Sequence, residues 1–65
     1  MTIGDIKVIL EEIKTVSFDD EIAHNKEYDL YVAVLQEIAA GAVNPIELAA
    51  EALKAKNIDF GRNFG

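Results

Sequence analysis

The most constraining feature of the sequence is a stretch of 22 residues, from Asp19 to Ala40, without a single glycine or proline. On a helical wheel its apolar side chains spread over roughly 200°, and the charged and amide side chains share the remainder. The apolar set consists of Tyr28, Leu30, Tyr31, Val32, Val34, Leu35, Ile38 and Ala39. One neighbouring helix covers only about a third of a helix surface. We therefore expect a central helix over residues 19–40, ended by a left-handed cap at Gly41 and packed against more than one neighbour.

The segment before the central helix carries one apolar stripe. Four apolar residues recur there at spacings of three and four, namely Ile3, Ile6, Leu10 and Ile13. This spacing is typical of an amphipathic helix. Thr2, with an acidic residue three positions later at Asp5, has the pattern of a helix N-cap. We expect a helix over residues 3–15, and a second cap in the acidic turn formed by residues 17–20.

The segment VNPIEL, residues 43–48, predicts the start of a third helix. Asn44 is a favourable N-cap, Pro45 is favourable at the first helical position, and Glu47 can close a capping box. The residues that follow are rich in alanine, so that a neighbouring helix can approach closely. We expect this helix to cover residues 45–56.

Three helices joined by short turns predict an all-α fold, a small three-helix domain that comprises the whole chain, residues 1–65. A chain this short buries only about 60% of the surface that its unfolded form exposes. It contains no cysteine, so disulfide bonds cannot stabilise it. Hydrophobic residues make up 51% of the chain, which favours association into a dimeric helical bundle. We expect a homodimer whose apolar interface is formed by Tyr28, Tyr31, Val32 and Leu35 of the central helix.

The C-terminal tail, residues 57–65, contains Asp59-Phe60-Gly61, which spells the magnesium-binding triplet of protein kinases. A kinase also requires a glycine-rich loop, a lysine on a strand and a catalytic loop, and the sequence has neither these motifs nor room for them. Phe60 and Phe64 are better explained as apolar anchors, and the glycines allow the chain to turn between them. We expect these two side chains to dock on the helices; docking on another chain is the alternative.

His24 is the only histidine, and Glu21-x-x-His24 matches half of the carboxylate–histidine pattern of di-iron bundles. In a homodimer the pattern would occur twice, and Glu11 or Glu12 of the first helix would have to supply the missing carboxylates. The Glu-x-x-His spacing is frequent by chance. With only one histidine, the sequence also offers no convincing Ser-His-Asp or Cys-His catalytic set. We expect neither a bound metal nor another cofactor, and no enzymatic activity. A helical bundle that binds a small ligand or a metal at His24 remains an alternative.

The chain has 12 acidic and 6 basic side chains and a net charge of −6. An acidic surface repels phosphate, which disfavours binding to nucleic acids and to anionic membranes. A DNA-reading helix presents basic or amide side chains, whereas the third helix offers Glu47, Glu51 and alanines. The sequence contains no apolar run of about 18 residues, the length needed to span a membrane. The N-terminus also lacks a signal-peptide pattern. We expect a cytoplasmic protein that binds neither nucleic acid nor membrane.

Acidic side chains gather in the first helix, the first turn and the start of the central helix. The five candidates for partner binding are Glu11, Glu12, Asp19, Asp20 and Glu27. Two interpretations stay open: a solvated face, and a patch that grips a basic groove of another protein around an apolar centre. The second interpretation places Asp19, Asp20 and Glu27 outside the core and predicts binding that weakens as salt screens the charges.

Residues 35–53, LQEIAAGAVNPIELAAEAL, resemble the helix–turn–helix segment that is common in very short orphan proteins of tailed bacteriophages. In those proteins an ALxEIAxG stretch precedes a short alanine-rich helix that ends in LAxEAL. The resemblance implies an accessory protein, often one that binds and inhibits a host factor, and it transfers no functional residues. We therefore expect a small acidic, non-enzymatic protein-interaction module, an inhibitor or regulator that binds a basic surface of a host protein in the host cytoplasm. A self-associating structural or assembly protein is the alternative.

Overall fold

The structure, a computed structural model, describes residues 1–62 of the chain. The described residues form three α-helices and a short 3-10 helix, with no β-strand among them. The elements are α1 (Ile3–Thr15), α2 (Asp20–Ala39), α3 (Pro45–Leu53) and η1 (Lys54–Asn57). The predicted all-α class with three helices is confirmed.

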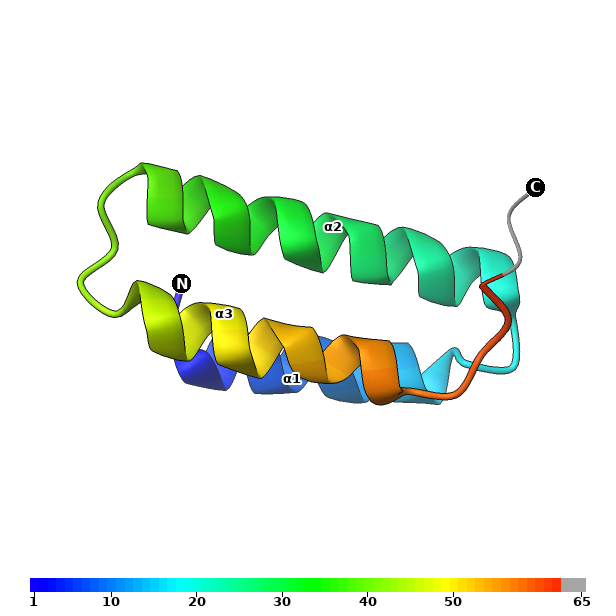
Figure 1. The fold of residues 1–65 in the computed structure, drawn as a ribbon. Coiled ribbons are helices and arrows are strands. Elements are labelled where there is room, and N and C mark those ends of the chain that lie inside the picture. Colours follow the sequence, from blue (N-terminus) through cyan, green and yellow to red (C-terminus); the bar gives the residue numbers. More distant parts are fainter. Residues whose placement is uncertain (63–65) are drawn as a thin grey trace.

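The long helix α2 spans the molecule, and α1 and α3 both lie against it (Figure 1). α1 and α3 run in the same direction, and α2 runs antiparallel to both. Each helix packs against the other two, so that α2 has two neighbours, as the width of its apolar arc requires. The turn between α1 and α2 and the segment after η1 meet at one end of the bundle (Figure 1).

Side-chain hydrogen bonds fix the first turn of α1 and of α2. The Thr2 hydroxyl accepts from the Asp5 N–H at 3.1 Å, and the Asp5 carboxylate accepts from the Thr2 N–H at 2.8 Å. The Asp19 carboxylate accepts from the N–H groups of Glu21 and Ile22 at 3.1 and 3.2 Å. Such caps satisfy N–H groups that have no partner within the helix. α1 therefore begins at the predicted residue, and α2 begins one residue later than predicted.

Gly41 follows α2 in the left-handed conformation, with a φ of 92°. The N–H groups of Gly41 and Ala42 bond to the carbonyl oxygens of Ile38 and Glu37, at 3.0 and 3.2 Å respectively. This pair of bonds is the Schellman motif, and glycine adopts its positive φ without the steric cost of a Cβ. The tight turn reverses the chain, so that α3 runs back along α2.

Helix α3 begins at the predicted residue, Pro45, but its predicted N-terminal cap and its predicted end both differ. The Asn44 side chain makes no capping hydrogen bond, and the backbone ψ of 55° lies outside the extended range that aims an N-cap side chain at the first turn. The predicted capping box with Glu47 is therefore absent. At the other end, the α-helix stops at Leu53, and residues 54–57 tighten into η1. This turn directs the chain towards the end of the bundle, where the following residues enter the core.

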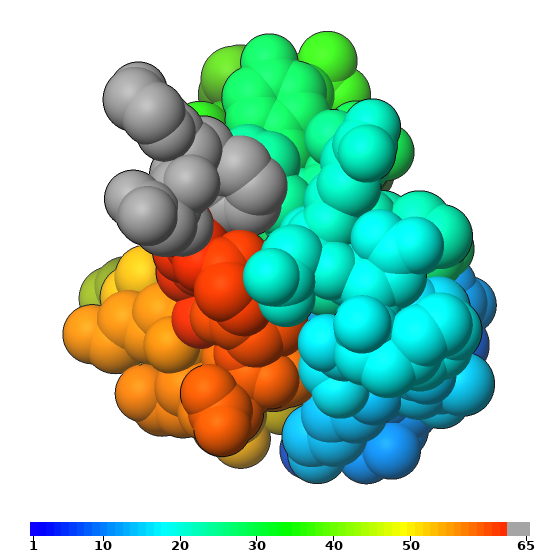
Figure 2. Space-filling view, turned by 90° about the vertical axis from the view of Figure 1, so that its right-hand side faces the viewer, coloured from blue at the N-terminus to red at the C-terminus, as the bar shows by residue number. Residues whose placement is uncertain are grey.

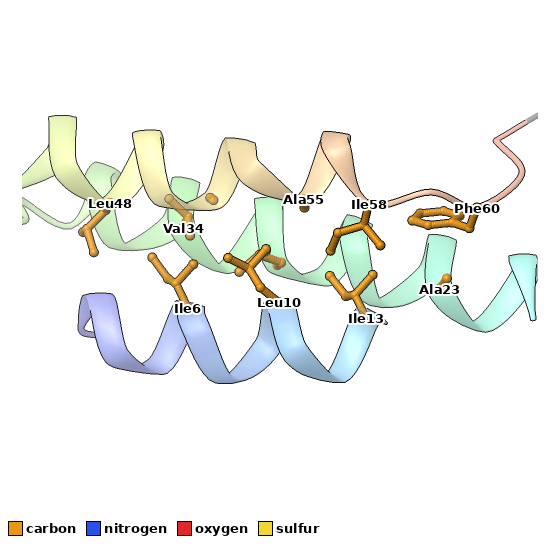
Figure 3. Packing of buried hydrophobic residues seen from close by; sticks show 11 residues of the cluster. Ile6, Leu10, Ile13, Ala23, Val34, Leu48, Ala55, Ile58 and Phe60 are labelled. Atoms are coloured by element: carbon orange, nitrogen blue, oxygen red, sulfur yellow. The ribbon is translucent and has the colours of Figure 1, made fainter. Parts of the chain in front are cut away.

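One apolar cluster between the helices forms the core (Figure 3). Its members are Ile6, Leu10, Ile13, Ala23, Leu30, Val34, Leu48, Ala52, Ala55, Ile58 and Phe60. Ala52 and Ala55 are small, which allows α3 and η1 to approach their neighbours closely. The last two members come from the segment after η1, so the core is complete only when this segment is in place.

Candidate protein-interaction surfaces

The C-terminal segment of the described chain packs on the end of the bundle where α2 begins. In Figure 2 the orange-red segment lies against the cyan turn and the first residues of α2. Phe60 is buried and belongs to the core. The Gly61 N–H donates to Asp20 Oδ1 at 2.8 Å, and a Cβ on Gly61 would collide with the same carboxylate. The kinase-like triplet thus takes part in packing, with Asp59 exposed; the second predicted anchor, Phe64, lies outside the described residues.

Arg62 fixes this segment through a nearly buried carboxylate. Its Nε donates to Glu27 Oε1 at 3.2 Å, and its Nη2 donates to Glu27 Oε2 at 3.1 Å. Nη2 also donates to the Ala55 carbonyl oxygen at 2.9 Å, and the guanidinium lies 3.7 Å from the centre of the Phe60 ring. The planar fork of an arginine matches a carboxylate with two parallel bonds and also stacks on aromatic rings. Arg62 therefore links α2, η1 and the terminal segment at one point.

Tyr31 extends this network along α2. Its hydroxyl donates to Glu27 Oε2 at 3.2 Å. Burial raises the pKa of the Tyr31 phenol above its ordinary value, and the negative charge of Glu27 and their hydrogen bond raise it further. The phenol therefore remains a neutral donor over a wider pH range than a solvated tyrosine.

The prediction that Glu27 lies outside the core is wrong. This residue is 6% exposed, because Arg62 arrives from 35 residues further along the chain and compensates the carboxylate there. Asp19 and Asp20 are also engaged within the chain, as the cap of α2 and as the acceptor for Gly61. Three of the five predicted partner-binding acids thus support the fold.

Grooves run along all three helix pairs, and they differ in charge. The α1–α3 groove, of about 530 Å³, is lined by Lys7, Leu10, Glu11, Lys14, Glu51, Lys54, Asn57 and Ile58. Glu51 pairs with Lys54 at 2.9 Å and with Lys7 at 3.4 Å. The hydrogen bond from Lys54, together with the charges of both lysines, lowers the pKa of Glu51. The charges of this groove therefore largely satisfy one another.

The α2–α3 groove is apolar. Its lining consists of Tyr31, Val34, Leu35, Ile38, Ala49, Ala52 and Leu53. The groove measures about 410 Å³, and no charged side chain lines it. Leu35 on α2 and Leu53 on α3 are 64% and 54% exposed. A contiguous exposed apolar surface of this kind is typical of a site that another chain covers.

Two of the four predicted dimer residues, Tyr31 and Leu35, line this groove. Tyr28 precedes Tyr31 by one turn of α2 and is exposed, which extends the apolar surface along the helix. Val32 is half-buried and does not line the groove. The α3 side of the groove was not predicted, although its residues lie at helical spacing in the sequence.

The α1–α2 groove combines apolar and acidic side chains. It measures about 460 Å³ and is lined by Val8, Glu11, Glu12, Thr15, Val16 and Lys26. The side chains of Glu11 and Glu12 are 72% and 52% exposed, and each has one lysine nearby, Lys14 at 3.1 Å and Lys26 at 3.6 Å. Exposed ion pairs of this kind contribute about 0–1 kcal/mol each. Glu11 and Glu12 are thus the predicted partner-binding acids that neither cap a helix nor hold the C-terminal segment.

Among residues 1–62, no three His, Cys, Asp or Glu side chains gather closely enough to hold a metal ion. His24 is half-buried on α2, and Glu21, the other member of the candidate metal pattern, is exposed. Within the same part of the chain, no helix has both the length and the apolar character needed to cross a membrane.

Comparisons of this chain with protein-family models, with curated proteins and with solved structures found no match. Function is therefore inferred from the grooves and from the distribution of charge. All acidic and basic side chains lie within residues 1–62, so the net charge of −6 belongs to the described surface.

Proposed function

We propose that this protein is a small, non-enzymatic protein-interaction module that forms a homodimer through the α2–α3 groove and presents its acidic surface to a basic partner protein. The observation that carries the proposal is the uncharged lining of this groove, with Leu35 and Leu53 more than half exposed. The lack of a convincing nucleophile–base set in the sequence supports a non-enzymatic role. The resemblance of residues 35–53 to phage accessory proteins favours an inhibitor or regulator of a host protein, acting in the host cytoplasm.

A second copy of the chain suits the groove because of where the charges lie. Each chain has a net charge of −6, so two copies repel each other over most of their surfaces. At the α2–α3 groove no charged side chain lines the surface, and two copies can meet there without opposed carboxylates. A two-fold axis would place the α2–α3 pair of one copy on that of the other, a four-helix arrangement with a shared apolar centre.

The size of the α2–α3 face sets the expected strength of the dimer. α2 has 20 residues and is about 30 Å long at about 1.5 Å per residue. Two helices packed about 8–10 Å apart present a face roughly 20 Å wide, and the shorter α3 covers only part of the length of α2. We therefore expect roughly 500 Å² buried per chain, near the lower limit of about 1,000 Å² in total for a specific interface. An interface at this limit is typical of a weak or transient dimer.

Sedimentation equilibrium at micromolar to millimolar protein concentrations tests the dimer. Leu35→Ser and Leu53→Ser each remove an exposed apolar side chain from the groove, and we expect each to weaken dimerisation about tenfold or more. Val43→Ser is the matched control, because Val43 is 99% exposed and lies in the turn before α3. A wild-type chain that stays monomeric at millimolar concentration would contradict the proposal. So would groove variants that dimerise as well as the control.

The effect of salt concentration distinguishes dimerisation from binding to a basic partner. Screening reduces the repulsion between two chains of the same sign, so the dimer should become stronger as salt rises. Binding of a basic protein should become weaker over the same range. If self-association weakens with salt, opposite charges hold the copies together and the uncharged groove is not the contact.

A further inference from the structure

The α1–α2 groove has the features of a second docking surface. It shares no lining residue with the α2–α3 groove. Val8 and Val16 supply its apolar side chains, and Val8 is exposed. Phe18 follows two residues after Val16 in the turn to α2 and is 84% exposed. Phe18 does not line the groove itself, but it adds an exposed aromatic side chain close in sequence to Val16, a type of residue that often anchors protein partners.

Two exposed carboxylates border the apolar part of this groove. On α1, Glu11 and Glu12 follow Val8 by three and four residues, so each lies one helical turn from this apolar position. Both carboxylates line the groove, together with one basic side chain, Lys26, which pairs with Glu12 at 3.6 Å. The groove thus offers an apolar position and two acidic positions within one turn of helix.

We propose that the α1–α2 groove binds a basic amphipathic helix of a partner protein. The apolar side chains of that helix cover Val8 and Val16, and its arginines or lysines pair with Glu11 and Glu12. In helix-in-groove recognition, apolar anchors at helical spacing on the bound helix enter an apolar groove. Here such anchors would meet the α1 residues that line the groove, which also lie at helical spacing. The net charge of −6 speeds the approach of a basic chain. The inference rests on the proposed binding of a basic partner, for which it names the site and the kind of segment bound; it does not require the dimer.

The lysines that pair with the two carboxylates do not block such a partner. The ion pairs of Glu11 with Lys14 and of Glu12 with Lys26 are partly exposed, and pairs of this kind contribute little to stability. An arginine of the partner can form two parallel bonds to a carboxylate, whereas a lysine acts as a point charge. Replacement of Lys14 or Lys26 by a partner arginine is therefore favourable, and the released lysine remains solvated.

Nuclear magnetic resonance titration of nitrogen-15-labelled protein with a synthetic helical peptide tests this surface directly. The probe peptide carries leucine and arginine at helical spacing, and the control peptide has glutamate in place of every arginine. We expect the amide resonances of Val8, Glu12, Thr15 and Phe18 to move with the probe and not with the control. Largest changes along the α2–α3 groove, equal changes with both peptides, or no changes at all would overturn the proposal.

Two double variants of equal charge separate the local carboxylates from the overall negative field. Glu11→Gln with Glu12→Gln removes two negative charges and changes the net charge from −6 to −4. Asp29→Asn with Glu47→Gln makes the same change at exposed positions that line none of the three grooves. The first pair should weaken binding of the probe peptide about tenfold or more, the effect of losing a charge-assisted hydrogen bond, and the second pair by much less. Equal weakening would overturn the assignment. Because dimerisation is measured without peptide, failure of one proposal is distinguishable from failure of the other.

Discussion

Loss of the ion pair between Arg62 and Glu27 should destabilise the protein strongly. Arg62→Met keeps the aliphatic part of the side chain and removes the guanidinium. Glu27 is 6% exposed. In the variant its carboxylate loses both hydrogen bonds from Arg62. Among the described side chains, the Tyr31 hydroxyl then remains as its hydrogen-bond donor. A carboxylate held away from water without a compensating charge costs free energy.

The structure sets the size of this effect. Removal of one partner from a fully buried ion pair costs about 3–5 kcal/mol. The Arg62 side chain is 32% exposed, so water can partly solvate Glu27 in the variant, and we expect a smaller loss of about 2–3 kcal/mol. The total free energy of unfolding of a domain of this length is roughly 3–10 kcal/mol. The Tm should fall by about 10 °C or more, since small domains lose about 4–8 °C per kcal/mol.

Urea unfolding followed by helical circular dichroism measures this loss, at a protein concentration low enough to keep the chain monomeric. Lys56→Met is the matched control, because Lys56 is exposed and forms no ion pair among residues 1–62. The control removes the same charge and should change the free energy of unfolding by less than about 0.5 kcal/mol. If Arg62→Met costs no more than the control, the reasoning about a buried carboxylate is refuted.

A double variant separates the charge from the packing. Glu27→Leu with Arg62→Met removes both charges and keeps apolar side chains of similar size. Because a buried ion pair can often be replaced by apolar side chains without loss of stability, we expect the double variant to regain most of what Arg62→Met loses. A double variant as unstable as the single one would assign the loss to the contacts of Arg62 with Phe60 and Ala55 instead.

Two further predictions concern the C-terminal segment and Tyr31. Gly61→Ala should lower the free energy of unfolding by about 1–2 kcal/mol, because a Cβ displaces the Asp20 carboxylate and breaks its bond with the Gly61 N–H. The same substitution should cost much less in an Asp20→Ala background, and an equal cost in both would contradict this explanation. Folding raises the pKa of Tyr31 above its ordinary value of 10.0, so the folded protein binds this proton more tightly than the unfolded chain does. Stability measured by urea unfolding should therefore fall as the pH rises through 10.0 towards the folded pKa, and Tyr31→Phe should reduce that fall; an unchanged profile would refute the assignment.

The helices could be predicted because their signals are local. The capping box of Thr2 and Asp5 and the left-handed glycine at Gly41 each act within a few residues of the chain. The end of α3 could not be predicted in the same way. Its change to a 3-10 helix after Leu53 follows from the packing of the next segment into the core, which no local pattern records.

The pairing of Arg62 with Glu27 depends on residues 35 positions apart, and charge patterns do not show which acid an arginine meets. One signal was present: Glu27 lies four residues from both Ala23 and Tyr31, on the apolar side of the helical wheel. A carboxylate at such a position requires a partner if the helix is packed there. The sequence also holds a single arginine, the side chain best suited to that role.

The candidate grooves could be predicted only in part. The width of the apolar arc on α2 predicts more than one neighbour, but it does not show that Leu35 stays exposed beside both of them. On α3, Leu48 is fully buried whereas Leu53 is more than half exposed, although both are leucines at apolar positions of one short helix. The two leucines are five positions apart, about 140° around the helix, and so point to different faces; which face enters the core depends on how α3 packs on α1 and α2.

The entry of Ile58 and Phe60 into the core affects how the protein is made. Synthesis runs from the N-terminus, so the residues of α1, α2 and α3 are made before Ile58 and Phe60, the last two members of the apolar cluster. The bond between Gly61 and Asp20, 41 residues apart in the chain, cannot form until residues 58–62 have emerged. The nascent helices therefore keep part of their apolar surface exposed to chaperones and proteases until that moment. The native state is reached after translation of this segment and not progressively during it.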